Sequence, residues 1–88
     1  MSIRPITIKD VKNDLGLWIK TLRKQQNLSQ EELALALNLS RLTIQNLESG
    51  KNPTIDTLLK VLQHFDVLER FSMFIGDETK NNNYDSLY

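Results

Sequence analysis

The chain has 88 residues, of which 40% are hydrophobic and 25% are charged, and its formal net charge is zero. This length allows one small domain, and the lack of cysteine excludes disulfide bonds, thiolate metal sites and a cysteine nucleophile. Because the first residues lack the apolar segment of a signal peptide and no stretch could span a membrane, we expect a cytoplasmic protein.

The charges are distributed unevenly along the chain. Residues 1–60 contain nine basic and six acidic residues, whereas residues 61–88 contain two basic and five acidic residues. The two parts therefore carry net charges of +3 and −3. This asymmetry indicates a mildly basic body and an acidic end, so the zero net charge does not exclude a nucleic-acid partner.

The first periodic segment has a helical repeat. Hydrophobic residues recur at steps of three and four along residues 9–26, which predicts a helix there. Thr7 and Asp10 supply oxygen atoms that can cap its start. Residues 1–8 are then a short N-terminal arm, and Asn27 is expected to form the turn that follows the helix.

Two short helices are predicted next, each opened by a serine. Ser29 precedes the first one, and Asn38 ends it because asparagine tolerates left-handed backbone geometry. Ser40 precedes the second one, which Gly50 ends for the same conformational reason. Helices separated by so short a turn must cross steeply, as in a helix-turn-helix, and the outer face of the second helix then protrudes.

Two further helices complete the predicted domain. The first of them follows a cap at Thr54 and is amphipathic. The second begins at Val67 or Leu68 and ends before Gly76. Residues 77–88 are polar and rich in asparagine, so they are predicted to form a flexible, acidic tail. The sequence shows no β-type alternation of useful length and therefore predicts an all-α protein.

The outer face of the third predicted helix carries side chains that suit the reading of DNA. Arginine pairs with guanine, the amides of glutamine and asparagine pair with adenine, and leucine contacts the methyl group of thymine. An α-helix also fits the width of the major groove. The residues expected to contact bases are Arg41, Leu42, Gln45 and Asn46.

Three segments resemble the Cro/C1-type helix-turn-helix family, also called the XRE family. They read SQEELA at residues 29–34, NLSRLTIQNLESGKNPT at residues 38–54 and TLLKVLQHF at residues 57–65. The resemblance covers roughly residues 15–67, with asparagine in two turns where the family usually has glycine. It implies a five-helix, lambda-repressor-like DNA-binding domain, which we place at residues 9–76.

The resemblance also implies roles for single residues. In the family, the glutamine at the start of the second helix binds phosphate or stacks on a side chain of the third helix, and Gln30 matches it. Thr43 and Lys51 are expected to contact phosphate as well. Arg23 and Glu48 match an arginine and a glutamate that form a structural ion pair, which fixes the placement of two helices.

Hydrophobic residues outside the expected core suggest a homodimer. A domain this small reads one half-site, so two-fold symmetry is needed to read a palindrome, with recognition helices about 34 Å apart. The alternative is that the same residues close the core of one domain. The residues assigned to the dimer interface are Trp18, Phe71, Phe74 and Ile75.

These patterns predict a sequence-specific regulator that represses its own operon as a homodimer. The combination of this domain with a short C-terminal extension resembles HipB-type antitoxins. This resemblance implies a HipA-like kinase toxin or an accessory subunit as a partner, and it makes the tail a candidate for partner contact or proteolytic control. The alternative function is a protein-interaction module with weak or no specific DNA binding. Zero net charge and the exposed leucines Leu35 and Leu42 favour that alternative.

No pattern in the sequence indicates an enzyme, a metal site or a cofactor. His64 has no accompanying histidine, cysteine or carboxylate cluster, and Glu31 and Glu32 are interpreted as charges at a helix start. Arg4, in the N-terminal arm, could contact the DNA backbone or the minor groove.

Overall fold

The computed structural model describes residues 4–51 and 53–86, with side chains up to residue 81. Within these residues the chain forms α-helices and no strand, so the predicted all-α class is confirmed. The helices are α1 Ile8–Gln25, α2 Gln30–Ala36, α3 Arg41–Glu48, α4 Ile55–His64 and α5 Leu68–Ser86.

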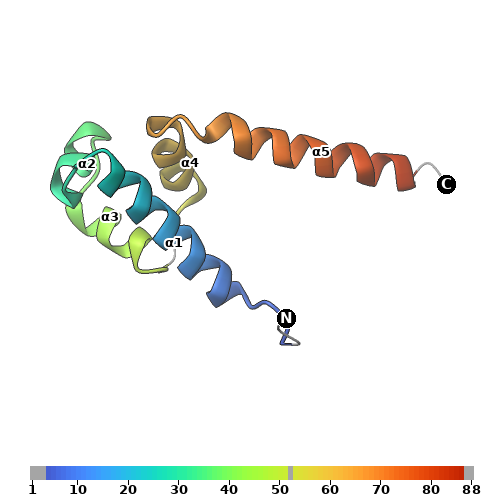
Figure 1. The fold of residues 1–88 in the computed structure, drawn as a ribbon, viewed down its shortest axis with the longest axis horizontal. Helices are drawn as coiled ribbons and strands as arrows, with labels where there is room; N and C mark the ends of the chain where they lie inside the picture. Colours follow the sequence, from blue (N-terminus) through green and yellow to red (C-terminus); the bar gives the residue numbers. More distant parts are fainter. Residues whose placement is uncertain (1–3, 52, 87–88) are drawn as a thin grey trace.

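The first four helices gather into one compact unit, and α5 projects from it (Figure 1). Within that unit α3 packs against both α1 and α2, while α5 contacts α4. The N-terminal part of α1 also extends beyond the unit, on the same side as α5 (Figure 1). The buried hydrophobic core consists of Ile19, Leu33, Ala34, Ile44, Leu47, Val61, Leu62, Phe65 and Val67.

Each helix from α1 to α4 begins at a hydroxyl side chain, as the sequence predicts. Thr7 and Asp10 form a reciprocal capping box at α1, in which each side chain accepts the other's backbone N–H at 3.0 Å. Ser29 and Glu32 do the same at α2. These hydrogen bonds to backbone N–H groups lower the pKa of both carboxyl groups. The other N-caps are Ser40 and Thr54.

The turns use residues that tolerate a positive φ. Asn27 has φ 58° and Asn38 has φ 55°, which confirms both predicted turn positions. Gly50 ends α3 with φ 79°, again as predicted. Asp66 also has a positive φ of 59°, between α4 and α5, and the sequence analysis did not identify it.

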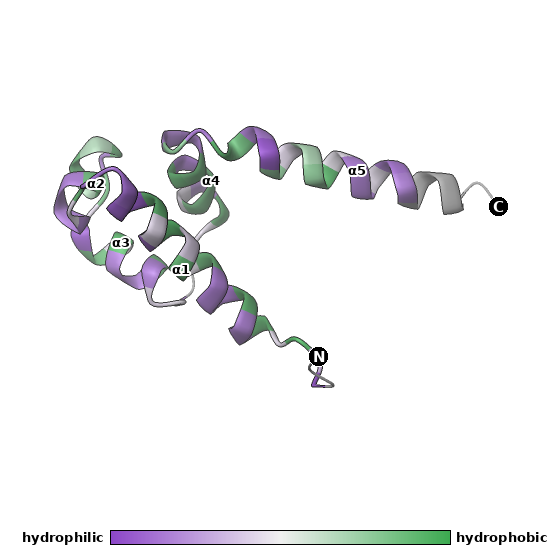
Figure 2. Cartoon of the chain, viewed as in Figure 1, coloured by the Kyte–Doolittle hydropathy of each residue, from purple (hydrophilic) through white to green (hydrophobic). Residues whose placement is uncertain are grey.

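The end of α5 differs from the prediction. We expected the helix to end before Gly76 and residues 77–88 to form a flexible tail, but α5 continues to Ser86, and residues 87–88 lie outside the described part. Gly76 is exposed, with open space around it, so no packed neighbour requires the chain to turn there. Only polar residues follow it up to residue 81 (Figure 2). A single exposed glycine therefore costs helix stability without ending the helix.

Candidate nucleic-acid interface

The turn between α2 and α3 is closed by local hydrogen bonds. The backbone N–H of Leu39 donates to the carbonyl of Ala34 at 2.8 Å, which satisfies one of the last carbonyls of α2. The hydroxyl of Ser40 then accepts the backbone N–H of Thr43 at 3.1 Å and starts α3. Because residues 37–40 are fixed in this way, the orientation of α3 relative to α2 is set locally.

The inner faces of α2 and α3 are completely covered. Leu33 and Ile44 have no exposed surface, and Leu47 is 2% exposed. Gly16 allows α1 to pass directly over the end of α3, since a Cβ atom at this position would collide with the carbonyl groups of Leu47 and Glu48. The sequence analysis did not identify this role, although a lone glycine inside a helical repeat often marks a close backbone contact.

A buried ionic network joins α1, α2 and α3. The guanidinium group of Arg23 donates through Nε to Glu48 Oε2 at 2.6 Å and through Nη2 to Glu48 Oε1 at 2.9 Å. Its Nη1 donates to the carbonyl of Leu28 at 2.7 Å, and Gln30 Nε2 donates to Glu48 Oε1 at 3.1 Å. Both charged side chains are less than a tenth exposed. The hydrogen bond to Glu48 raises the pKa of Arg23.

The geometry gives this network a structural purpose. A two-pronged contact between a guanidinium group and a carboxylate fixes both distance and orientation, so Arg23 and Glu48 hold α1 and α3 in one relative placement. Burial makes that placement stringent, because moving either helix would leave a charge without a partner in a dry environment. The network therefore determines which face of α3 points outward.

That outward face carries the side chains expected to contact bases. Arg41 and Gln45 are exposed, and Leu42 is 62% exposed. Asn46 lies at the edge of the same face and is half-buried. The structure thus brings these four residues together on one helix whose other face is fully packed.

The three expected phosphate contacts differ in their surroundings. Gln30 is half-buried, and its amide N–H already donates to Glu48. Thr43 is also half-buried, with its hydroxyl 2.8 Å from that of Ser40. Lys51 is exposed directly after the glycine that ends α3. Of the three, only Lys51 carries a charge, and it is also the most exposed.

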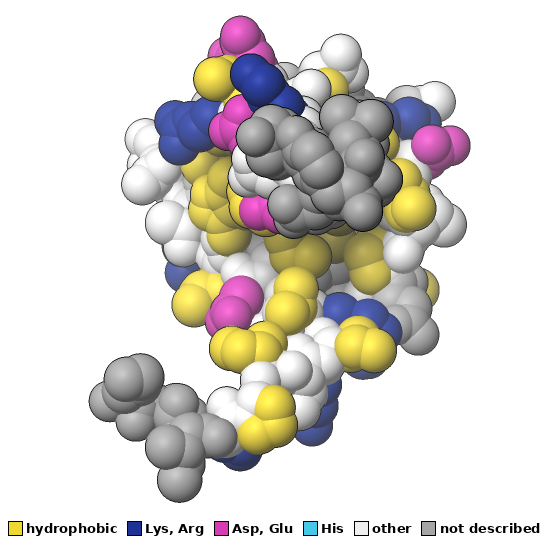
Figure 3. All heavy atoms as spheres, turned by 90° about the vertical axis from the view of Figure 1, so that its right-hand side faces the viewer, with side chains coloured by type: hydrophobic (Ala, Val, Ile, Leu, Met, Phe, Trp, Pro, Cys, Tyr) yellow, Lys and Arg dark blue, Asp and Glu magenta, His cyan; other side chains and the backbone are white. Residues whose placement is uncertain are grey.

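The four residues assigned to a dimer interface fall into two classes. Trp18 and Phe71 are partly buried and pack against the core. Phe74 and Ile75 are 60% and 49% exposed on α5. Figure 3 looks at the molecule from the side on which α5 projects, and hydrophobic side chains gather on that face around the helix. The structure thus divides the set between the core and the surface.

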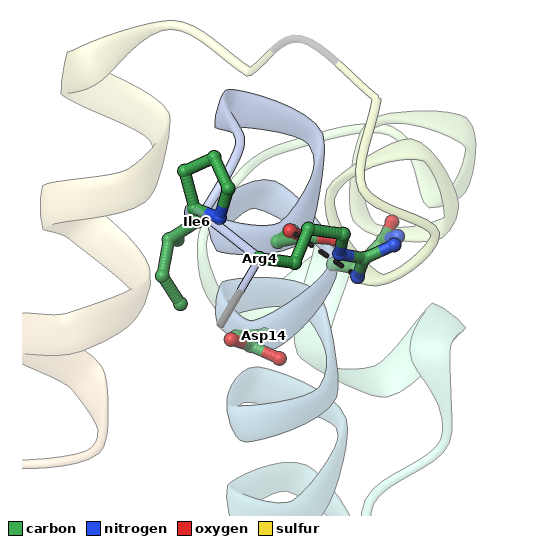
Figure 4. Close-up of a pocket in the computed structure, with 6 residues that line it drawn as sticks. Arg4, Ile6 and Asp14 are labelled. Carbon is green, nitrogen blue, oxygen red and sulfur yellow. Dashed lines mark ion pairs between the residues drawn. The ribbon is translucent and has the colours of Figure 1, made fainter. Parts of the chain in front are cut away.

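Arg4 lies beside the start of α1, in a polar notch of about 380 Å³ (Figure 4). Its Nη2 atom is 3.9 Å from Asp10 Oδ2, and the Arg4 side chain is 77% exposed. Asn13 and Asp14 line the same notch. The two carboxylates of the notch, on Asp10 and Asp14, outnumber the one guanidinium group of Arg4, so the notch itself is a poor phosphate site.

The described residues give little indication of catalysis, metal binding or a membrane span. His64 packs edge-on against Phe65, with ring centroids 5.0 Å apart. No cluster of histidine and acidic residues within residues 4–51 and 53–81 has the arrangement of a metal site. In the described part of the chain, none of the helices combines the length and the hydrophobicity that crossing a membrane requires.

Comparison with known proteins also indicates a helix-turn-helix protein. A family model described as helix-turn-helix matches residues 19–70. A protein of Methanocella arvoryzae named as an HTH-type transcriptional regulatory protein is 45% identical over 51 residues, which are 58% of this chain and 16% of that protein. The uncharacterized HTH-type transcriptional regulator y4mF of Sinorhizobium fredii is 44% identical over 52 residues, 57% of this chain and 67% of that protein. The chain thus spans a small part of the first relative.

The matched region contains the features described above. It includes α2, α3 and α4 in full, together with Arg23 on α1 and the outward face of α3. The sequence resemblance implied two serine-capped helices joined by a short turn, and a buried ion pair that ties the second of them, α3, to α1. The match covers more than half of the chain, and the chain therefore belongs to the XRE-type helix-turn-helix family.

Proposed function

We propose that this protein is a sequence-specific, DNA-binding transcriptional regulator that acts as a homodimer. The observation that supports this proposal is the outward face of α3. Arg41, Leu42 and Gln45 are exposed on a helix that is held by a buried network and a packed inner face. Rigid presentation matters because reading a base edge requires hydrogen-bond donors and acceptors at fixed positions.

In this mechanism α3 enters the major groove. Arg41 pairs with a guanine, Gln45 and Asn46 pair with adenine, and Leu42 contacts a thymine methyl group. Lys51 contacts a phosphate beside the major groove, and Gln30 and Thr43 lie against the phosphate backbone of the DNA. The protein acts by occupying DNA and carries out no chemical step.

Dimerisation supplies the second half-site. Two copies related by a two-fold axis place their recognition helices about 34 Å apart, so the operator is a palindrome with half-sites one helical turn apart. The exposed hydrophobic residues of α5, which include Phe74 and Ile75, support an interface on that side of the molecule. An arrangement of this type blocks transcription when the palindrome overlaps a promoter, and we propose the protein's own promoter as the target, in the cytoplasm.

A DNA titration tests this proposal. Purified protein is titrated against DNA from upstream of its gene, with random DNA as the competitor. We expect tight binding that the Arg41→Ala/Gln45→Ala variant loses. The matched control is Arg70→Ala/Gln63→Ala, which removes the same residue types from exposed positions on α5 and α4 and is expected to bind like the wild type. Equal binding by all three proteins would contradict the assignment of α3.

Salt dependence separates a protein that binds DNA from a module that binds only another protein. A dimer that neutralises several phosphates loses affinity by orders of magnitude between about 50 and 200 mM salt. Lys51→Ala is expected to reduce the slope of this dependence without changing the preferred sequence. A flat salt response would favour the second candidate function.

That second candidate is a module that binds another protein. Leu35 on α2 is 76% exposed and Leu42 on α3 is 62% exposed, which favours contact with an apolar partner surface. In a HipB-like antitoxin, that partner would be a HipA-like kinase toxin or its accessory subunit. Co-purification with the product of a neighbouring gene, lost in Leu35→Ser, would support this role, and failure to bind any such product would contradict it.

A further inference from the structure

The N-terminal half of α1 contacts the turn that follows α3. Asn13, Gly16 and Arg23 follow one another along α1 at steps of three and seven, so they lie on one side of the helix. Arg23 holds the carboxylate of Glu48, and Gly16 lies against the backbone carbonyl group of the same residue. Asn13 continues this side toward the N-terminus and reaches the turn beyond the end of α3.

Asn13 occupies the space beside Gly50. A Cβ atom on Gly50 would collide with Oδ1 of Asn13, and it would lie 3.3 Å from both the Cα atom and the backbone nitrogen of Asn13. Gly50 also has a φ of 79°, which residues with a side chain rarely adopt. The turn after α3 therefore needs glycine for two reasons, its backbone conformation and the close approach of α1.

The same turn is also tied to α3. The backbone carbonyl of Asn46 accepts the N–H of Lys51 at 2.9 Å and the hydroxyl of Ser49 at 3.1 Å. The N–H of Gly50 donates to the carbonyl of Leu47 at 3.3 Å. The backbone that carries Lys51 is thus held by hydrogen bonds from α3 and, at the preceding residue, by contact with α1.

We propose that Asn13 is a positioning residue for the contact of Lys51 with a DNA phosphate. This inference rests on the DNA-binding function proposed above and adds a residue of α1 to it. A lysine side chain is long and flexible, so its contact with phosphate is stronger when the backbone that carries it does not move. By filling the space beside Gly50, the Asn13 side chain prevents the turn from shifting toward α1 and limits the positions that Lys51 can take.

Helix stability does not explain an asparagine at this position. Asn13 is exposed, so its side chain adds little to the core, and asparagine is a weaker helix former than alanine. It also lies before the region that the family model matches, which begins at residue 19. The contact with Gly50 gives this side chain a purpose that the matched region alone does not supply.

DNA titrations over a range of salt concentrations test the proposal with the wild type, Asn13→Ala, Lys51→Ala and the double variant. We expect Asn13→Ala to weaken binding at least about threefold and to lower the salt slope, because it weakens a phosphate contact. In the Lys51→Ala background the same change should have no further effect, since the side chain that Asn13 positions is absent. Gln25→Ala removes another exposed amide from α1 and is the matched control, which should bind like the wild type.

Two measurements without DNA accompany the titrations. Asn13→Ala should unfold at the same urea concentration as the wild type or a higher one, because alanine is the better helix former, so weaker binding does not come from a loss of fold. The backbone N–H of Lys51 donates to Asn46 and exchanges its hydrogen only when the turn opens. We expect this exchange to be faster in Asn13→Ala and unchanged in Gln25→Ala.

The outcomes separate this inference from the proposed function. Faster exchange at Lys51, together with a loss of binding that disappears in the Lys51→Ala background, supports the positioning role. Unchanged exchange, a loss of binding that persists in that background, or a Lys51→Ala variant that binds like the wild type overturns this role, while the DNA-binding function stands. A wild-type protein that binds no DNA overturns both.

Discussion

Around Glu48, three helices meet through buried hydrogen bonds and close backbone contact, whereas α4 and α5 meet through hydrophobic side chains that stay partly exposed. Each buried side-chain nitrogen or oxygen atom in the first region has a hydrogen-bond partner within the same chain. In the second region a groove of about 550 Å³ remains open. One copy of the chain thus completes the packing around the face that we propose reads DNA, and it leaves the surface between α4 and α5 open.

The largest expected effect comes from breaking the network. Glu48→Ala leaves the guanidinium group of Arg23 buried without its carboxylate, and we expect a loss of about 3–5 kcal/mol in the free energy of unfolding. Urea denaturation measures it. Arg4→Ala, which breaks the exposed contact with Asp10 and leaves the capping box at α1 in place, is the control and should cost far less. Similar losses in both variants would show that the buried network contributes no more to the free energy of unfolding than an exposed contact does.

Two glycine-to-alanine substitutions, one in α1 and one in α5, compare a closely packed position with an open one. Gly16→Ala pushes a methyl group into the carbonyl groups of Leu47 and Glu48, so we expect a loss of about 1–3 kcal/mol. Gly76→Ala has open space and should stabilise α5 by up to about 1 kcal/mol through helix propensity. Thermal unfolding of both variants checks this. A neutral Gly16→Ala would mean that α1 and α3 can separate without cost.

Two serine-to-alanine substitutions are expected to differ by less in their effect on the free energy of unfolding. Ser40→Ala removes the N-cap of α3, and the expected cost is about 1 kcal/mol. Ser72 lies inside α5, where alanine is the better helix former, so Ser72→Ala should be neutral or slightly stabilising. Denaturation midpoints compare the two variants. The reverse order would contradict the capping role of Ser40.

The smallest expected effect is a dependence on pH. The pKa values of Asp10 and Glu32 are lowered in the folded protein by hydrogen bonds with Thr7 and Ser29. Their stabilising contribution is therefore present above the ordinary carboxyl pKa, about 4, and is lost as the pH falls through the lower folded value. We expect Asp10→Asn/Glu32→Gln to flatten the loss of stability below about pH 4. An unchanged acid profile would assign the loss to other carboxyl groups.

Local signals in the sequence were sufficient for most of the fold. The caps at Ser29 and Ser40 and the turns at Asn38 and Gly50 each depend on a few neighbouring residues, and the structure confirms them. The end of α5 was not predictable in the same way. Gly76 permits a helix end but does not require one, and no packed neighbour makes the chain turn there, so α5 continues past it.

Only the part of the candidate site that depends on local patterns was predictable from the sequence. The outward residues of α3 follow from the helical period and the family resemblance. The hydrogen bond from Gln30 to Glu48 and the close approach at Gly16 depend on how three helices come together in space. No local pattern encodes that arrangement, and the α4–α5 groove was missed for the same reason.

We propose that the outward face of α3 reads a palindrome. The most direct test is selection of binding sites from random DNA by the wild type and by Arg41→Ala. We predict that the wild type selects a two-fold symmetric sequence, and that the variant loses preference at one position in each half-site, at a cost of about 1–3 kcal/mol in binding free energy. No enriched sequence, or the same sequence selected equally well by both proteins, would contradict the account.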